Sequence, residues 1–174
     1  MKSLPLASAL LLAISAIAHA GTAEGLVALE AKDYVTARKE FESAAKKGDP
    51  EAHYQLALFY ITYDLGVQPD MLRATSYFKN AAKRGHVAAA RMYGYLNRAG
   101  EGVSRSDIEA FGWFSYAAKN GDAKSREELD TYFKGRSEKW HAKADRRALE
   151  IAADIKRQLA QDEVAKATGK PVVK

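Results

Sequence analysis

Beyond residue 20, the side chains best suited to metal chemistry in this 174-residue chain are three histidines, His53, His86 and His141. Their spacing matches neither an HExxH motif nor another common pattern of metal ligands. We therefore expect each of them to be structural or exposed. His86 stands at the start of a predicted helix, where it can serve as a cap. No metal and no cofactor is expected.

A second candidate group is acidic. Glu127, Glu128 and Asp130 crowd one short segment, and paired carboxylates can carry out acid–base catalysis on glycans. That chemistry needs two carboxylates facing each other across a cleft, whereas Glu127 and Asp130 are neighbours on one helix surface. The chain has no cysteine, and no histidine is placed to activate a hydroxyl nucleophile. We predict a protein that is not an enzyme and has no catalytic residues.

The elements that carry these residues repeat. Three segments end in Ala-Ala, two polar residues and glycine, and the glycines at 48, 85 and 121 are 37 and 36 residues apart. This period is typical of stacked helical hairpins. Upstream of each glycine, two alanines and a phenylalanine share one helix face at i, i+4 and i+7: Ala37, Phe41, Ala44; Ala74, Phe78, Ala81; Ala110, Phe114, Ala117. Each glycine should then end its helix in a left-handed conformation.

A second helix is predicted after each glycine. Its packing positions also align between the repeats: Ala52, Ala89, Ser125; Leu56, Tyr93, Leu129; Tyr60, Asn97, Phe133. Turns are expected at Gly66-Val67 and at 100–103. Asp70, and Ser106 with Asp107, can cap the helices that follow these turns.

This pattern resembles the Sel1-like repeat family, a relative of the tetratricopeptide repeats. The resemblance covers residues 22–133 and is carried most closely by Gly94, Gly100, Gly102, Val103, Ala110, Trp113, Ala117, Ala118 and Gly121. The preceding repeat matches with Ala57 where glycine is usual. The resemblance implies an all-α, right-handed α/α solenoid of Sel1-like or tetratricopeptide-like helical hairpins over residues 21–135. It also implies binding of another protein.

Residues 1–20 have the pattern of a signal peptide. Lys2 precedes an apolar run over 4–18, and Ala18-His19-Ala20 resembles a cleavage site. We expect cleavage after Ala20 and a periplasmic location, with secretion as the alternative. The apolar run is too short to span a bilayer comfortably, so no transmembrane segment is expected.

The C-terminal part of the chain is basic. Residues 134–174 hold 11 Lys or Arg against 6 Asp or Glu, whereas residues 21–133 hold 15 against 16. A long helix over 137–163 is indicated by an apolar stripe: Trp140, Ala144, Ala148, Ile151, Ile155 and Leu159. We predict a capping helix over 136–165 and a flexible tail over 166–174. The basic face, residues 139–157, could also contact an anionic surface; nucleic acid is not an expected partner.

Partner binding is predicted on the first helix of each hairpin, which lines the concave side of such solenoids. The positions left over after packing is assigned are Tyr54, Leu58, Arg91, Tyr95 and Arg98. Tyrosine and arginine dominate binding hot spots; alternatively, the tyrosines pack between helices and the arginines are merely solvated. We predict an interaction scaffold or adaptor that modulates a cell-envelope complex. The alternative is a binder of cell wall or anionic lipid through the basic helix.

Overall fold

The computed structural model describes residues 21–62 and 68–169, and the regular structure within these ranges is helical. A helix over residues 21–30 comes first. It is followed by α2 (Tyr34–Lys46), α3 (Pro50–Ile61), α4 (Met71–Lys83), α5 (Val87–Ala99), α6 (Asp107–Lys119), α7 (Ala123–Glu128), a π-helical turn at Leu129–Phe133, and α8 (Glu138–Thr168). The predicted signal peptide, the Gly66-Val67 turn and the tail from residue 170 lie outside the described residues.

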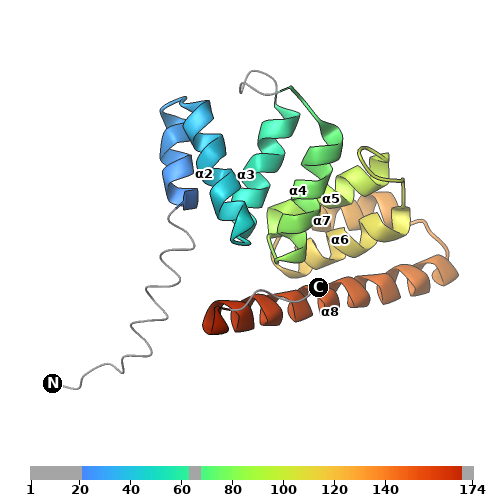
Figure 1. Cartoon of the computed structure of the whole chain (residues 1–174). Helices are drawn as coiled ribbons and strands as arrows, with labels where there is room; N and C mark the ends of the chain where they lie inside the picture. Colours follow the sequence, from blue (N-terminus) through green and yellow to red (C-terminus); the bar gives the residue numbers. More distant parts are fainter. Residues whose placement is uncertain (1–20, 63–67, 170–174) are drawn as a thin grey trace.

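The helices form a row of antiparallel hairpins (Figure 1). Each of α2 to α6 packs against the next helix along the chain. The long helix α8 does not extend this row. It lies along α6 and reaches α4. The architecture is therefore the α/α solenoid with a covering C-terminal helix that the sequence predicts.

The repeated glycines make the sharp turns between consecutive helices. Gly48, Gly85 and Gly121 have φ angles of 85°, 84° and 95°, which glycine adopts without steric cost. At the first turn, the Gly48 N–H donates to the Ala45 carbonyl and the Asp49 N–H to the Ala44 carbonyl, so the last carbonyls of α2 are satisfied. The residue after each glycine then caps the next helix with its side chain: Asp49, His86 and Asp122.

The aligned alanines and phenylalanines form the core between hairpins. Phe41, Phe78 and Phe114 are fully buried. Alanines and glycines opposite these rings let the helices approach closely. At Gly94, an added Cβ would lie 2.9 Å from the ring of Phe114. The packing register predicted from the repeat is confirmed by this burial.

The apolar stripe of α8 faces the repeats. Ala144, Ala148, Ile151 and Ile155 are buried, while Leu159 is 41% exposed. The helix continues to Thr168, past the predicted boundary at 165. No strong helix breaker occurs before Gly169, which ends the helix with φ of 64°.

Candidate interaction surfaces

The five residues predicted to bind a partner lie on two alternate helices, α3 and α5. Tyr54 and Leu58 belong to α3, and Arg91, Tyr95 and Arg98 follow one another along α5. All five side chains are half-buried. We call them the α5 strip. The structure shows that each of them has partners within the protein.

At the start of α5, Tyr54 stacks on the imidazole of His86, with ring centres 4.5 Å apart. The Nδ1 atom of His86 accepts the Ala89 N–H at 3.1 Å, as expected for a cap. Nε2 therefore carries the proton and faces Glu51 at 2.9 Å. This hydrogen bond lowers the pKa of Glu51 more than burial raises it. The result is a polar link between α3 and α5.

Arg91 connects α5 to α7. Its Nε lies 3.1 Å from a carboxylate oxygen of Asp122, the residue that caps α7. Burial alone would raise the pKa of Asp122, but hydrogen bonds from Ser125 and the charge of Arg91 lower it. The ion pair therefore holds Asp122 charged, in the state that caps best.

Arg98 is held between a carboxylate and the rings of Tyr95, Phe114 and Tyr132. It forms an ion pair with Glu128. Its guanidinium carbon lies 5.1 Å from the ring centre of Tyr95 and 4.7 Å from that of Tyr132, and Tyr95 packs edge-on against Phe114 at 5.0 Å. Burial raises the pKa of the Tyr95 hydroxyl, and Glu128 raises it further. The tyrosine thus packs as in the alternative interpretation, while the arginine is anchored rather than freely solvated.

A second candidate surface is a cleft of about 450 Å³ between the repeats and α8. We call it the α8 cleft. Residues from α4, α5, α6, α8 and the loop between α5 and α6 line it. A smaller hollow of about 210 Å³ shares Lys83 and Asp154 with it and continues to Gln161. Together the two hollows follow α8 from Arg147 to Gln161.

The α8 cleft has an aromatic floor and a cationic rim. Tyr93 and Trp113 pack edge-on with ring centres 5.2 Å apart, and Ile151 and Ile155 complete the apolar lining. Trp113 is only 4% exposed. Its indole N–H is buried and has no hydrogen-bond partner among the described residues.

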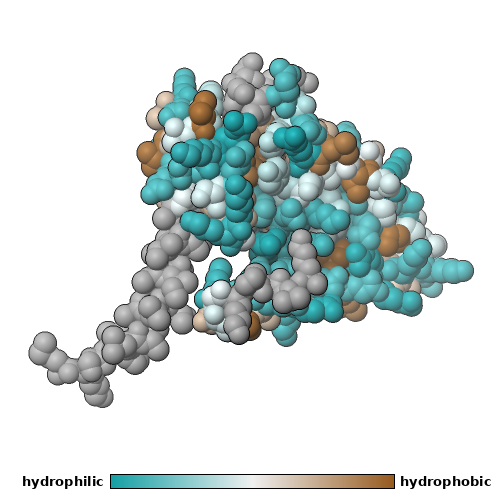
Figure 2. Space-filling view, in the orientation of Figure 1, coloured by the Kyte–Doolittle hydropathy of each residue, from teal (hydrophilic) through white to brown (hydrophobic). Residues whose placement is uncertain are grey.

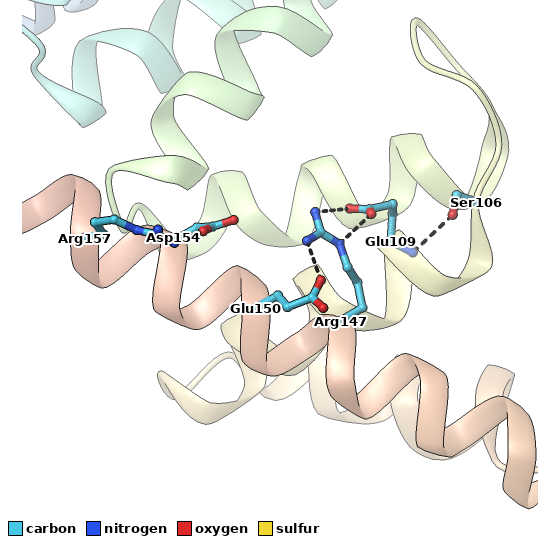
Figure 3. Close-up of polar contacts among 6 residues, drawn as sticks. All are labelled: Ser106, Glu109, Arg147, Glu150, Asp154 and Arg157. Atoms are coloured by element: carbon cyan, nitrogen blue, oxygen red, sulfur yellow. Dashed lines mark hydrogen bonds and ion pairs between the residues drawn. The ribbon is translucent and has the colours of Figure 1, made fainter. Parts of the chain in front are cut away.

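The ion pairs at the rim fix α8 against α6. The Arg147 guanidinium donates to both carboxylate oxygens of Glu109, at 2.6 and 3.2 Å, and to Glu150 at 3.0 Å (Figure 3). The hydrogen bonds to Glu109 are the main cause that raises the pKa of Arg147. Asp154 pairs with Arg157 further along α8. Both carboxylates that line the cleft are thus already engaged.

The groups considered for chemistry do not converge. Glu127 and Asp130 are exposed, whereas Glu128 is the partner of Arg98. His53 is buried. Across residues 21–62 and 68–169, no three His, Asp or Glu side chains come together in a way that could hold a metal ion.

Sequence reasoning did not find the α8 cleft. In the sequence, Trp113 stood out only as a position of the repeat pattern, and neither Lys79 nor Lys83 was assigned a role. They come together because α8 runs back along α4 and α6. The sequence signal that could have indicated the cleft is the lysine pair at i and i+4, Lys79 and Lys83, beside the core face of a repeat helix.

The stacked helical hairpins make this chain an α/α repeat protein. A family model described as Sel1 repeat matches residues 50–86 and 87–122, which span α3–α4 and α5–α6 with their closing turns. The chain thus carries two Sel1 repeats within a Sel1-like repeat fold. Sel1 repeats generally mediate protein–protein interaction and serve as a non-catalytic scaffold.

Two solved structures share this fold. One is c5321, a protective antigen present in uropathogenic Escherichia coli strains that displays an SLR fold. It superposes with a TM-score of 0.71 over 90% of this chain and 34% of its own, at 23% identity. The other is a Sel1 repeat protein from Oxalobacter formigenes, with a TM-score of 0.60 over 69% of this chain and 96% of its own, at 25% identity.

A relative in sequence is the uncharacterized protein NMB1327 of Neisseria meningitidis serogroup B. It is 32% identical over 105 residues, which make up 60% of this chain and 21% of that protein. The chain therefore spans about a fifth of this relative's length.

Proposed function

We propose that the protein is a non-enzymatic interaction scaffold or adaptor that modulates a complex of the bacterial cell envelope from the periplasm. The observation that carries this proposal is the α5 strip on a pair of Sel1 repeats. The signal-peptide pattern of residues 1–20 supports the periplasmic location. Within the described residues, no helix has the length and apolar character needed to cross a bilayer.

The α5 strip suits recognition because its side chains are already held in place. Arg91 is fixed by Asp122, and Arg98 by Glu128 and the rings of Tyr95 and Tyr132. Immobilised side chains lose little conformational entropy when a partner binds. On the face shown in Figure 2, hydrophobic residues are scattered among hydrophilic ones rather than gathered in one patch. Such a surface favours a partner recognised through tyrosine, arginine and hydrogen bonds.

The test is crosslinked capture of envelope proteins, quantified by mass spectrometry. Arg91→Gln with Arg98→Gln removes the charges of the strip. Ala88→Arg adds bulk beside it without breaking an ion pair, so it separates loss of binding from loss of stability. The control, Lys143→Gln with Arg146→Gln, removes two exposed charges from α8. Both strip variants should lose the partner that the control retains. Capture retained by Ala88→Arg would exclude the strip as the binding surface.

The alternative function, contact with cell wall or anionic lipid, is supported by the outer side of α8. Lys139, Lys143, Arg146 and Lys156 are exposed. None of them forms an ion pair within the described part of the chain. Anionic surfaces attract such clusters at low salt. The test is sedimentation of the protein with phosphatidylglycerol vesicles or purified cell wall. Binding that is abolished in the Lys143→Gln, Arg146→Gln variant would favour this function.

A further inference from the structure

The α8 cleft is richer in hydrogen-bond donors than in free acceptors. Lys79 and Lys83 line one side, and each ammonium group offers three donors and no acceptor. No ion pair involves either lysine among the described residues. The carboxylates of Glu109 and Asp154 are occupied by Arg147 and Arg157.

A ligand that brings carboxylates would pair with the two lysines, since charge-assisted hydrogen bonds to carboxylate are the stronger kind. The aromatic and aliphatic floor would meanwhile cover the apolar parts of that ligand. The cleft is thus complementary to a chain that carries both acidic and apolar groups.

The α8 cleft and the smaller hollow beside it together have the length of a peptide rather than of a single small anion. From Arg147 to Gln161, α8 rises by about 21 Å at 1.5 Å per residue. This distance accommodates about six residues of extended chain. We infer that the α8 cleft binds an extended acidic segment of a partner protein, with carboxylates directed at Lys79 and Lys83 and apolar side chains over the aromatic floor.

This inference rests on the proposed protein-binding function but concerns a different surface. Arg91 and Arg98 of the α5 strip pair with Asp122 and Glu128, whereas the α8 cleft lies between the repeats and α8. If the peptide does not bind, the proposed role of the α5 strip therefore still stands. If the strip variants still capture the partner, the proposed role of the α8 cleft still stands. An assay with purified protein and a defined peptide tests the cleft without depending on the partner captured through the strip.

The experiment measures binding of a labelled hexapeptide, (Glu-Ala)₃, by fluorescence anisotropy, with (Gln-Ala)₃ as the neutral comparison. Lys79→Gln with Lys83→Gln should weaken binding roughly tenfold or more, because two charge-assisted contacts are lost. The matched control is Lys139→Gln with Lys143→Gln, an exposed i, i+4 lysine pair outside the cleft. It lowers the net charge equally and should change affinity by less than about twofold.

A second measurement reports on the cleft itself. Trp140→Phe leaves Trp113 as the remaining tryptophan, so its emission should shift when the acidic peptide binds and stay constant with the neutral one. Equal affinity for the two peptides, equal losses in the two lysine variants, or an unchanged Trp113 emission on binding would each overturn the inference.

Discussion

His53 shows how the fold sets the charge of a single residue. Its side chain is buried, with its ring 5.9 Å from that of Tyr77. Burial, and secondarily the nearby charge of Arg84, lowers its pKa from 6.5 to about 4, although Asp49 opposes this. The histidine therefore stays neutral in the folded protein at pH values where the unfolded chain binds a proton. This buried histidine is structural, as one of the two interpretations of the sequence expected.

The first prediction concerns acid stability. Because the unfolded chain takes up a proton below pH 6.5 and the folded chain does so only near pH 4, stability should fall as the pH is lowered through this window. The full loss corresponds to about 3 kcal/mol. Urea unfolding at pH 7, 6 and 5 measures the part of this loss that falls above pH 5, about 2 kcal/mol.

The matched variant is His53→Gln, which cannot take up a proton. Its stability should vary less between pH 7 and 5 than that of the wild type. The carboxylates with lowered pKa, Glu51 and Asp122, lose their contribution only at lower pH. An identical slope in both proteins would show that another group controls this window.

Phe78 tests the packing register at a single position. It is fully buried among residues of α3, α4 and α5. Phe78→Ala should lower the free energy of unfolding by about 3–5 kcal/mol, through lost burial and the cavity left behind. Ser76→Ala, two residues away and exposed, should change it by less than about 0.5 kcal/mol. Denaturant unfolding compares them, and similar values would refute the register.

At the scale of elements, the close approach of α5 and α6 depends on Gly94. An alanine there would gain up to about 1 kcal/mol in helix propensity. Its Cβ would also lie 2.9–3.1 Å from three ring carbons of Phe114, which is fully buried and cannot move aside. Since overpacking costs about 1–3 kcal/mol, Gly94→Ala should be destabilising on balance.

The control for Gly94→Ala is Gly135→Ala. No atom lies within 4 Å of the position that its Cβ would take, so thermal unfolding should be nearly unchanged. A Gly94→Ala protein as stable as this control would mean that α5 and α6 separate without cost.

The elements could be predicted because their packing residues repeat. The alignment of Phe41, Phe78 and Phe114 determines which face of each helix is buried, and the glycines after them determine where each helix ends. The capping role of His86 followed from its place just after such a glycine. The end of α8 is also marked by a glycine, Gly169, but it lies outside the repeat, and the predicted boundary at 165 fell short of it.

The candidate surfaces were less accessible to sequence reasoning. The α5 strip could be named from leftover positions, but the pairing of Arg91 with Asp122 and of Arg98 with Glu128 joins residues about thirty positions apart. Those contacts depend on how far each hairpin is rotated relative to the next. The α8 cleft depends in addition on the direction in which α8 returns, which no repeated residue encodes.

At the scale of the whole molecule, α8 connects the later helices of the solenoid by packing on α6 and reaching α4. Its first turns cover the end of the row, where Trp140 stacks on Phe133 with ring centres 5.5 Å apart. Its middle packs on α6. Further on, Arg84 at the end of α4 lies 3.4 Å from a carboxylate oxygen of Asp162. One helix thus joins both Sel1 repeats and forms a wall of the α8 cleft.

At Gly112, α8 packs closely on α6. A Cβ there would lie 2.6 Å from Ile151 and 3.6 Å from backbone atoms of Ala148. The end of Ile151 could move, but the Ala148 backbone leaves no room for the two further methyl groups of valine. Gly112→Val should therefore lift α8 from the repeats, whereas Gly135→Val, in open space, should not.

The displacement of α8 has consequences that can be measured separately. Hydrogen exchange of the α8 amides should accelerate in Gly112→Val relative to Gly135→Val, because a helix that loses its packed face loses most of its stability in water. Exchange in α3, deep in the row, should change less, since each hairpin contacts mainly its neighbours. The acidic peptide should no longer bind, as one wall of its cleft has moved. Protection of α8 equal to that of the control would show that its attachment does not depend on the contact at Gly112.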